Sequence, residues 1–205
     1  MADLHAFRDA VAGWAGGGPG GPASDLAGRL GVRTAVLLEG PSDLAAVEAL
    51  AERRGRDLAA EGVCVMPMGG AMCVGRYAGL LGPPGLGLRL AGLCDEGEQR
   101  FYDRALKRAR APRPGYFVCV ADLEDELIRT LGTAGAEETV RAAGDLRAWQ
   151  IFLRQPAQHG RPRQQQLRRF LGTKKGRKIR YGRLLVEALA SDQVPAPLAD
   201  LLASV

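Results

Sequence analysis

One short stretch of this chain restricts its fold more than any other. In residues 34–43 an apolar run is followed at once by Glu-Gly-Pro-Ser-Asp. The apolar run predicts a buried strand that brings Glu39 to the carboxyl edge of a sheet, where α/β proteins place their sites. Pro41 suits the first turn of a helix, which Ser42 or Asp43 can cap. Glu39 and Asp43 are therefore expected on one edge, an arrangement that suits a hard divalent cation such as magnesium.

Three more apolar runs follow, at 63–66, 88–95 and 116–120, and they alternate with helical patterns. This alternation predicts an α/β fold with a parallel sheet flanked by helices. Parallel strands end on one edge, so Asp95 and the acids at 122–126 are expected beside Glu39. Asp43 alone is typical of a helix cap. A carboxylate that ends a buried strand, by contrast, is costly unless it is paired or bound to a metal.

The rest of the chain divides into three parts. Helices are predicted at 44–54, 72–81, 98–109, 122–131, 136–152, 164–171, 180–189 and 195–202. Residues 1–22 are predicted to be an N-terminal helix, 4–14, followed by a Gly/Pro linker at 16–22. We favour a helix packed on the flank of the domain over one that docks a partner. Residues 23–145 form the α/β core, and 146–205 form a basic helical extension that completes the domain.

These features together resemble a TOPRIM domain, and in particular the branch found in OLD (overcoming lysogenization defect) nucleases. The resemblance covers residues 34–190. It rests on Leu-Leu-Glu-Gly-Pro-Ser-Asp at 37–43, the Gly69-Gly70 turn, Asp95, Asp-Leu-Glu at 122–124, and Lys178 ahead of an aromatic residue. The general TOPRIM pattern has a second aspartate where this chain has Gly97, a position at which OLD-like relatives vary.

The resemblance implies magnesium- or manganese-dependent cleavage of phosphodiester bonds by a two-metal type of mechanism. It implies that Asp43, Asp95 and Glu124 hold metal and that Glu39 is a ligand or the general base. Lys178 would neutralise charge on the phosphate; Lys175, about one turn away, is the alternative. Because Gly97 stands in place of the second aspartate, the number of bound metal ions, one or two, is left open. Glu96 or Glu98 could replace the missing ligand. In the acidic run, Asp122 is expected to cap a helix, and Asp125 and Glu126 are expected to face solvent.

Positive charge is concentrated near the C-terminus. The chain has 28 basic and 23 acidic residues, yet the stretch between Asp145 and Glu187 contains twelve basic residues and no acid. Such a stretch is expected to bind an anionic partner, and nucleic acid is favoured over a merely solubilising surface. The residues predicted to bind nucleic acid are Arg161, Arg163, Arg168, Arg169, Lys174, Lys175, Arg177 and Arg180.

The leading hypothesis is therefore a metal-dependent DNA nuclease. A TOPRIM nuclease that matures RNA and a non-catalytic nucleic-acid-binding TOPRIM module are the alternatives. The chain has no phosphate-binding Gly-x-x-x-x-Gly-Lys-Ser/Thr loop, whereas full-length OLD proteins carry an ATPase domain, so a separate ATPase partner is conceivable. No apolar stretch reaches membrane-spanning length and no signal peptide is recognised, which favours the cytoplasm. The four cysteines lack paired spacing and are predicted to be free thiols.

Overall fold

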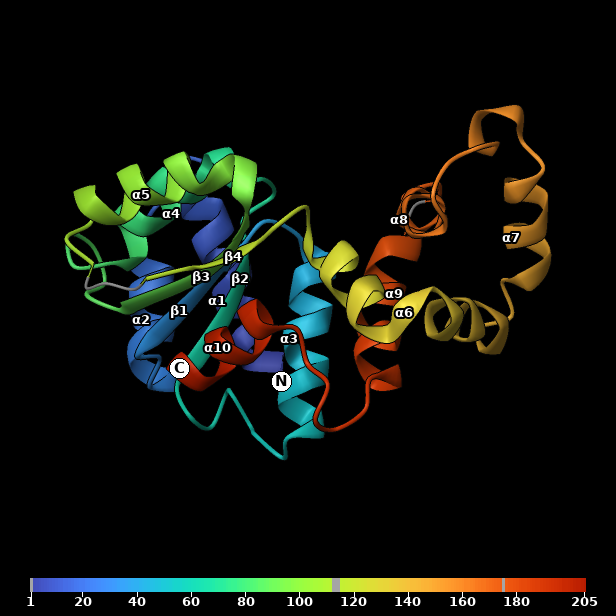
Figure 1. Ribbon diagram of the computed structural model, residues 1–205. Coiled ribbons are helices and arrows are strands. Elements are labelled where there is room, and N and C mark those ends of the chain that lie inside the picture. Colours follow the sequence, from blue (N-terminus) through green and yellow to red (C-terminus); the bar gives the residue numbers. More distant parts are fainter. Residues whose placement is uncertain (1, 112–114, 175) are drawn as a thin grey trace.

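A computed structural model describes residues 2–111, 115–174 and 176–205. Its centre is a four-stranded parallel sheet in the order β2 (Val63–Pro67), β1 (Thr34–Leu38), β3 (Arg89–Asp95) and β4 (Phe117–Cys119) (Figure 1). The predicted α/β fold with a parallel sheet flanked by helices is confirmed. The chain leaves β1 for β2 on one side and then returns to β3 on the other. The carboxyl ends of β1 and β3 therefore flank the point where the order reverses, the usual place for a site in such sheets.

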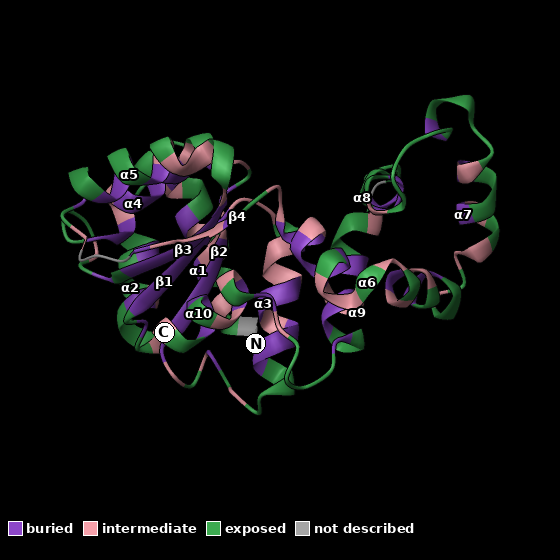
Figure 2. Cartoon of the chain, in the orientation of Figure 1, coloured by how far each residue is buried: buried purple, intermediate pink, exposed green. Residues whose placement is uncertain are grey.

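Strand β1 is central, and all of its residues are buried. Side chains alternate across the pleat: Val36 and Leu38 belong to one apolar core, whereas Ala35 and Leu37 belong to the other. Figure 2 shows β1, β2 and β3 buried along most of their length. A strand with two covered faces explains the unbroken apolar run before Glu39.

Four helices cover one face of the sheet: α1 (Ala2–Ala15), α2 (Gly21–Leu30), α4 (Val74–Leu81) and α5 (Gln99–Arg108). The predicted N-terminal helix packs on this flank, with Phe7 and Val11 fully buried. The predicted linker at 16–22 is too long, because α2 begins within it. Pro22 lies in the first turn of α2, where a missing amide N–H is tolerated.

The other face is covered by α3 (Pro41–Arg53) and α10 (Ala196–Ser204), and a helical lobe extends beyond them. Figure 1 shows this lobe, built from α6 (Leu123–Ala142), α7 (Leu146–Leu153), α8 (Arg163–Leu171) and α9 (Arg177–Ala188). The helix boundaries differ from prediction here. α6 runs on through a kink at Gly132 to Ala142, and Gly144, with φ 79°, separates it from α7. The single helix predicted over 136–152 is therefore wrong.

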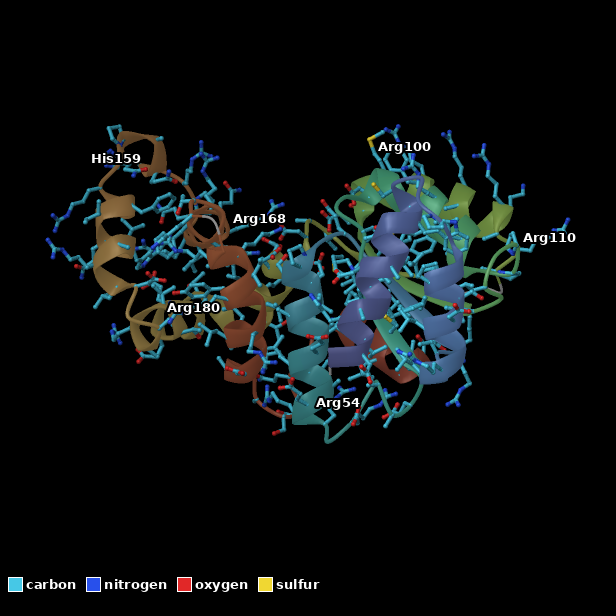
Figure 3. All side chains as sticks on the ribbon, turned by 180° about the vertical axis from the view of Figure 1, so that it is seen from behind. Arg54, Arg100, Arg110, His159, Arg168 and Arg180 are labelled. Atoms are coloured by element: carbon cyan, nitrogen blue, oxygen red, sulfur yellow. The ribbon has the colours of Figure 1, made fainter. Side chains whose placement is uncertain are left out.

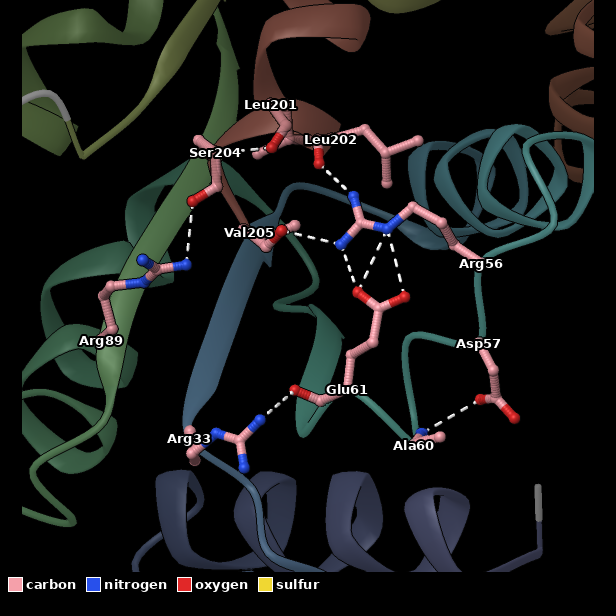
Figure 4. Close-up of polar contacts among 10 residues, drawn as sticks. All are labelled: Arg33, Arg56, Asp57, Ala60, Glu61, Arg89, Leu201, Leu202, Ser204 and Val205. Atoms are coloured by element: carbon pink, nitrogen blue, oxygen red, sulfur yellow. Dashed lines mark hydrogen bonds and ion pairs between the residues drawn. The ribbon is translucent and has the colours of Figure 1, made fainter.

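Helix α10 returns from the lobe to the sheet and is held there by two arginines (Figure 4). Arg56 donates to the carbonyl oxygens of Leu202 and, at 2.7 Å, Val205, and it pairs with Glu61. Arg89 donates to the Ser204 carbonyl oxygen at 2.8 Å. The last helix thus closes the α/β core. Within the described residues, no helix combines the length and apolar character that crossing a membrane requires.

Two 3₁₀ turns follow strand ends: η1 (Ala71–Cys73) after β2 and η2 (Glu96–Glu98) after β3; a third, η3 (Pro156–Gln158), lies between α7 and α8. All four cysteines are free thiols, as predicted, and those in β2, β3 and β4 are buried.

Candidate metal centre and nucleic-acid interface

Three carboxylates meet at the carboxyl edge of the sheet. Glu39 follows β1, Asp95 ends β3, and Glu98 lies in the 3₁₀ turn after it. One oxygen from each lies within 4.8 Å of the others. Parallel strands impose this convergence, since β1 and β3 are neighbours and both end here. The cluster thus combines two residues that the sequence predicted with one, Glu98, that it considered only as a replacement.

The Gly-Gly turn after β2 supports this cluster from the backbone. The amides of Gly69 and Gly70 both donate to the Glu39 carbonyl oxygen at 3.0 Å. Gly69 has φ 77° and Gly70 has φ 131°, conformations that residues with a Cβ rarely adopt. The turn therefore fixes the main chain at Glu39 while leaving its carboxylate free to face the edge.

Burial and repulsion both act on Asp95. Burial, and after it the negative charges of Asp122, Glu39, Glu98 and Asp43, together raise its pKa to about 7. The pKa of Glu98 is also raised, by burial and then by Glu39. Uncompensated negative charge of this kind favours either bound protons or a bound cation.

The donor set of this cluster fits a divalent metal ion. Glu98 Oε2 is buried and has no hydrogen-bond partner among the described residues, so it remains available to a ligand. The other donors are carboxylate oxygens of Glu39 and Asp95, the type that Mg²⁺ and Mn²⁺ prefer. Glu96, the other candidate replacement, is exposed.

Asp43 and Glu124 lie in an adjacent group and are not members of the three-residue cluster. Asp43 accepts a hydrogen bond at 2.9 Å from the Gly40 amide, so it helps to begin α3 as well as facing the site. Burial, and after it the negative charge of Glu124, raise the pKa of Asp43 to about 7, although the Gly40 amide and Lys178 oppose the rise. The capping role and a ligand role are compatible, because only Oδ2 makes this bond.

Glu124 forms an ion pair with Lys178. It lies in the first turn of α6, its side chain is 3 % exposed, and Lys178 Nζ is 3.1 Å from its Oε2. Burial raises the pKa of Glu124 despite the lysine. Burial would lower the pKa of Lys178, but Glu124, Asp122 and Asp43 outweigh it and raise the pKa. The lysine is therefore held charged beside the acidic edge.

A close helix contact places Lys178. Gly182 lies one turn further along α9, and a Cβ added to it would meet the Ser42 carbonyl oxygen at 2.4 Å. Residues four apart share a helix face, so the face that carries Lys178 is pressed against the start of α3. Lys175, the alternative lysine, lies outside the described residues.

The rest of the acidic run differs in part from prediction. Asp122 caps α6 as expected, accepting from the Asp125 amide at 2.8 Å. Glu126 was expected to face solvent, but it is buried and accepts from the Val120 amide at 2.9 Å. It also pairs with Arg129. Asp125 is partly buried and bonded to Gln164 at 2.8 Å.

Half of the twelve basic residues in the C-terminal stretch form ion pairs with described acids of the same chain. Arg168 lies 2.6 Å from Asp122, and Arg163 lies 3.0 Å from Glu137. Arg177 and Arg180 each lie 3.6 Å from Asp145. The side chain of Arg177 is only 9 % exposed and stacks over Phe170. These cations therefore help to fold the lobe, a role that the sequence interpretation did not assign to them.

A polar pocket of about 430 Å³ lies beside α8. Its lining includes Arg161, Gln164, Gln165, Arg168 and Arg169. Through Arg168 and its partner Asp122, the pocket adjoins the acidic edge. Arg169 and Lys174 are exposed and have no ion-pair partner in the described parts of the chain. Three of the predicted nucleic-acid-binding residues, Arg161, Arg168 and Arg169, thus share one pocket.

Comparisons with known proteins agree with this architecture. Residues 32–96 match the model of the TOPRIM domain of overcoming lysogenization defect protein-like proteins. The chain is similar to the C-terminal region of the Xanthomonas campestris pv. campestris OLD protein, with 25 % identity and a TM-score of 0.63 over 84 % of this chain and 93 % of that one.

The C-terminal region of the Burkholderia pseudomallei OLD protein has the same fold, with 22 % identity and a TM-score of 0.62 over 84 % of this chain and 96 % of that one. No curated protein sequence matches the chain significantly. The matched residues include Glu39, Asp43 and Asp95. The chain therefore contains an OLD-like TOPRIM domain and has the fold of the C-terminal region of OLD proteins.

Proposed function

We propose that this chain is a metal-dependent nuclease that cleaves phosphodiester bonds in DNA. The observation that carries the proposal is the convergence of Glu39, Asp95 and Glu98, whose oxygens lie within 4.8 Å of one another. TOPRIM domains of the OLD family are generally metal-dependent nuclease modules. Mg²⁺ or Mn²⁺ is the cofactor that these oxygen donors suit.

Each group has a role in the proposed reaction. Glu39, Asp95 and Glu98 would hold one divalent cation, and Asp43 and Glu124 are available to a second. Such cations, when bound, stabilise charge on the phosphate and lower the pKa of a coordinated water. Glu39 can serve instead as the general base. Lys178, held 3.1 Å from Glu124, directs its positive charge to the same edge, where it would donate to a phosphate oxygen.

The lobe supplies the surface that would carry the nucleic acid to this edge. Arg161 and Arg169 line one pocket, with Gln164 and Gln165 as neutral hydrogen-bonding groups; Arg168 lines it too but is paired with Asp122. Arginine binds phosphate oxygens through a planar fork of donors. Arg163, Arg177 and Arg180 support the lobe through their ion pairs. They would act on nucleic acid mainly by long-range electrostatic attraction and not by direct hydrogen bonds.

A plasmid assay tests the proposal. Purified chain with Mg²⁺ or Mn²⁺ should nick or degrade plasmid DNA, and EDTA should stop the reaction. Glu39→Gln and Asp95→Asn should each abolish cleavage with the fold intact by circular dichroism. Glu96→Gln is the matched control, since Glu96 is exposed in the same segment. Full activity in either site variant would contradict the assigned site.

Two further measurements, DNA binding and cleavage of structured RNA, address the alternatives. Binding to DNA without metal-dependent cleavage would indicate a non-catalytic module. Cleavage of structured RNA under conditions that leave DNA intact would indicate an RNA-maturation nuclease.

A further inference from the structure

We propose a second nucleic-acid-binding surface, the exposed basic face of α5, which continues the substrate path on the other side of the metal centre. This face consists of Arg100, Arg104, Lys107 and Arg108. The inference rests on the proposed function. It extends that function to a second surface, because α5 lies outside the basic C-terminal stretch. Its partner is the phosphate backbone of a nucleic-acid strand.

The first observation is that these cations are not neutralised. All four are exposed, and none forms an ion pair within the part of the chain that the structure describes. In the C-terminal stretch, by contrast, Arg163, Arg168 and Arg183 each have a carboxylate within 3.2 Å. Part of the unpaired positive charge of the molecule therefore lies on α5. The density of basic residues along the sequence points to the C-terminal stretch and not to this helix.

The one acid on this helix, Asp103, forms no ion pair with these four cations within the described residues. Asp103 accepts a hydrogen bond at 2.8 Å from the hydroxyl of Tyr116, which lies beside β4. Arg100 lies over the ring of Phe101, with its guanidinium carbon 4.9 Å from the ring centroid. Contact through the face of a guanidinium leaves its N–H donors free at the edges.

Helix stability does not explain this charge pattern. Like charges four residues apart, as in Arg100, Arg104 and Arg108, destabilise a helix. Lys107 and Arg108 complement the helix dipole in the last turn, but Arg100 stands in the first turn, where the dipole disfavours a cation. A bound polyanion would turn this repulsion into attraction.

The position of α5 relates its basic face to the metal centre. Asp95 ends β3, Glu98 closes the 3₁₀ turn, and α5 begins at the next residue. Figure 3 shows Arg100 at this end of α5 and Arg168 of the lobe on either side of α3, whose first turn carries Asp43. A strand that passes over the acidic edge from the lobe would therefore meet Arg100 first.

The helix provides a rigid support for such a strand. Tyr102 is buried beneath it, and its hydroxyl donates to the carbonyl oxygens of Leu93 at 3.0 Å and Leu37 at 3.3 Å. α5 is thereby bonded to both strands that carry the site. Residues four apart rise about 6 Å along a helix, comparable with the separation of neighbouring phosphates along one strand.

The test uses the full chain with Glu39→Gln, which blocks cleavage during binding measurements. Arg100→Gln and Arg104→Gln are combined and compared with Arg29→Gln and Arg54→Gln, which remove the same charge at exposed sites on α2 and at the end of α3. Binding of a labelled duplex and a labelled single strand is followed by fluorescence anisotropy from about 50 to 200 mM salt.

The α5 pair should raise Kd for nucleic acid about tenfold or more at low salt and reduce the salt slope by about two, one for each lost phosphate contact. The control pair should change neither by more than about twofold. An equal loss in both pairs, or no loss in the α5 pair, would overturn the inference. So would a loss of polyglutamate binding with nucleic-acid binding intact, since the partner would then be an acidic protein.

Hydrolysis of bis-p-nitrophenyl phosphate by the wild-type chain reports on the metal centre separately. This small diester is too short to contact the metal centre and the basic face of α5 at the same time. Hydrolysis together with unchanged nucleic-acid binding in the α5 pair would refute the α5 surface and leave the proposed function standing. Weakened binding in the α5 pair without metal-dependent hydrolysis of either the diester or DNA would refute the nuclease function and retain the surface.

Discussion

Gly182 of α9 packs directly on Ser42 of α3: a Cβ at position 182 would lie 2.4 Å from the Ser42 carbonyl oxygen and 3.2 Å from its carbonyl carbon. Both atoms belong to the backbone and cannot move aside independently. The contact holds the lobe against the α/β core at the point where Asp43, Glu124 and Lys178 meet. Glycine at this position is therefore a condition for the proposed site as well as for the helix packing.

We expect Gly182→Ala to separate α9 from α3 and to displace Lys178. The free energy of unfolding should fall by about 1–3 kcal/mol, the usual effect of overpacking, and the maximal rate of DNA cleavage should fall with it. Urea unfolding and single-turnover cleavage measure the two effects. Gly79→Ala is the control, because Gly79 also lies in a helix but has open space around its Cβ position. Equal stability in both variants would show that the contact is unimportant.

Lys178→Ala separates binding from catalysis. If the lysine stabilises the transition state, the maximal rate at saturating DNA should fall about 100-fold or more. Lys174→Ala should behave as a binding-only control at fixed ionic strength, since Lys174 is exposed and has no ion pair with a described residue. An unchanged maximal rate in Lys178→Ala with a large fall in Lys175→Ala would assign the role to Lys175. No fall in either would remove lysine from the mechanism.

Stability without metal should depend on pH in a predictable direction. The pKa values of Asp43 and Asp95 are raised from 3.8 to about 7 in the folded chain. The folded state therefore binds protons more tightly than the unfolded state, so their contribution to stability is greatest below pH about 4 and is lost as pH rises to about 7. In EDTA, Tm should fall over this range by an amount that Asp43→Asn and Asp95→Asn reduce.

Added Mg²⁺ should raise Tm more at pH 8 than at pH 5, because ligands must be deprotonated to bind. A magnesium-induced rise in Tm that is equal at both pH values would argue against a site built from these two carboxylates. Differential scanning fluorimetry on the wild-type chain and both variants provides the comparison.

Glu98 should contribute to metal affinity although its spacing does not match the usual TOPRIM pattern. Glu98→Gln should weaken Mn²⁺ binding at least about tenfold, the size of effect found even for residues that only orient a ligand. Glu96→Gln should leave affinity unchanged, since its side chain is exposed. Isothermal titration calorimetry distinguishes the two. Equal Mn²⁺ affinities in the Glu98→Gln and Glu96→Gln variants would show that the Glu98 carboxylate does not bind the metal.

The elements that determine the edge of the sheet could be predicted from the sequence. The apolar runs before Glu39 and Asp95 identify buried strands, and alternation with helices indicates parallel pairing. Together these bring both acids to one edge without any knowledge of distant contacts. The order Glu-Gly-Pro-Ser-Asp likewise predicts the start of α3, because capping and proline preferences act within one turn.

Charge and glycine patterns were less informative. Asp125 and Glu126 are adjacent, yet only Glu126 turns inward, where it accepts the Val120 amide at the end of β4. The linker predicted at 16–22 has the composition of a loop, but Gly21 and Pro22 open α2. In each case the local preference was weak: a backbone amide six residues before Glu126 turned its side chain inward, and Pro22 proved compatible with the first turn of a helix.

The sequence by itself determined the sheet, its acidic edge and the positions of Glu39 and Asp95, because strand pattern and parallel order depend on residues close together in the chain. Only the tertiary structure decided that Glu98 joins them, that Glu124 pairs with Lys178 across 54 positions, and that Arg163 and Arg180 pair with acids of the same lobe. The position of Lys178 beside Glu124 depends on how α9 packs on α3 through Gly182. Such packing is a property of two surfaces in contact, which no local pattern encodes.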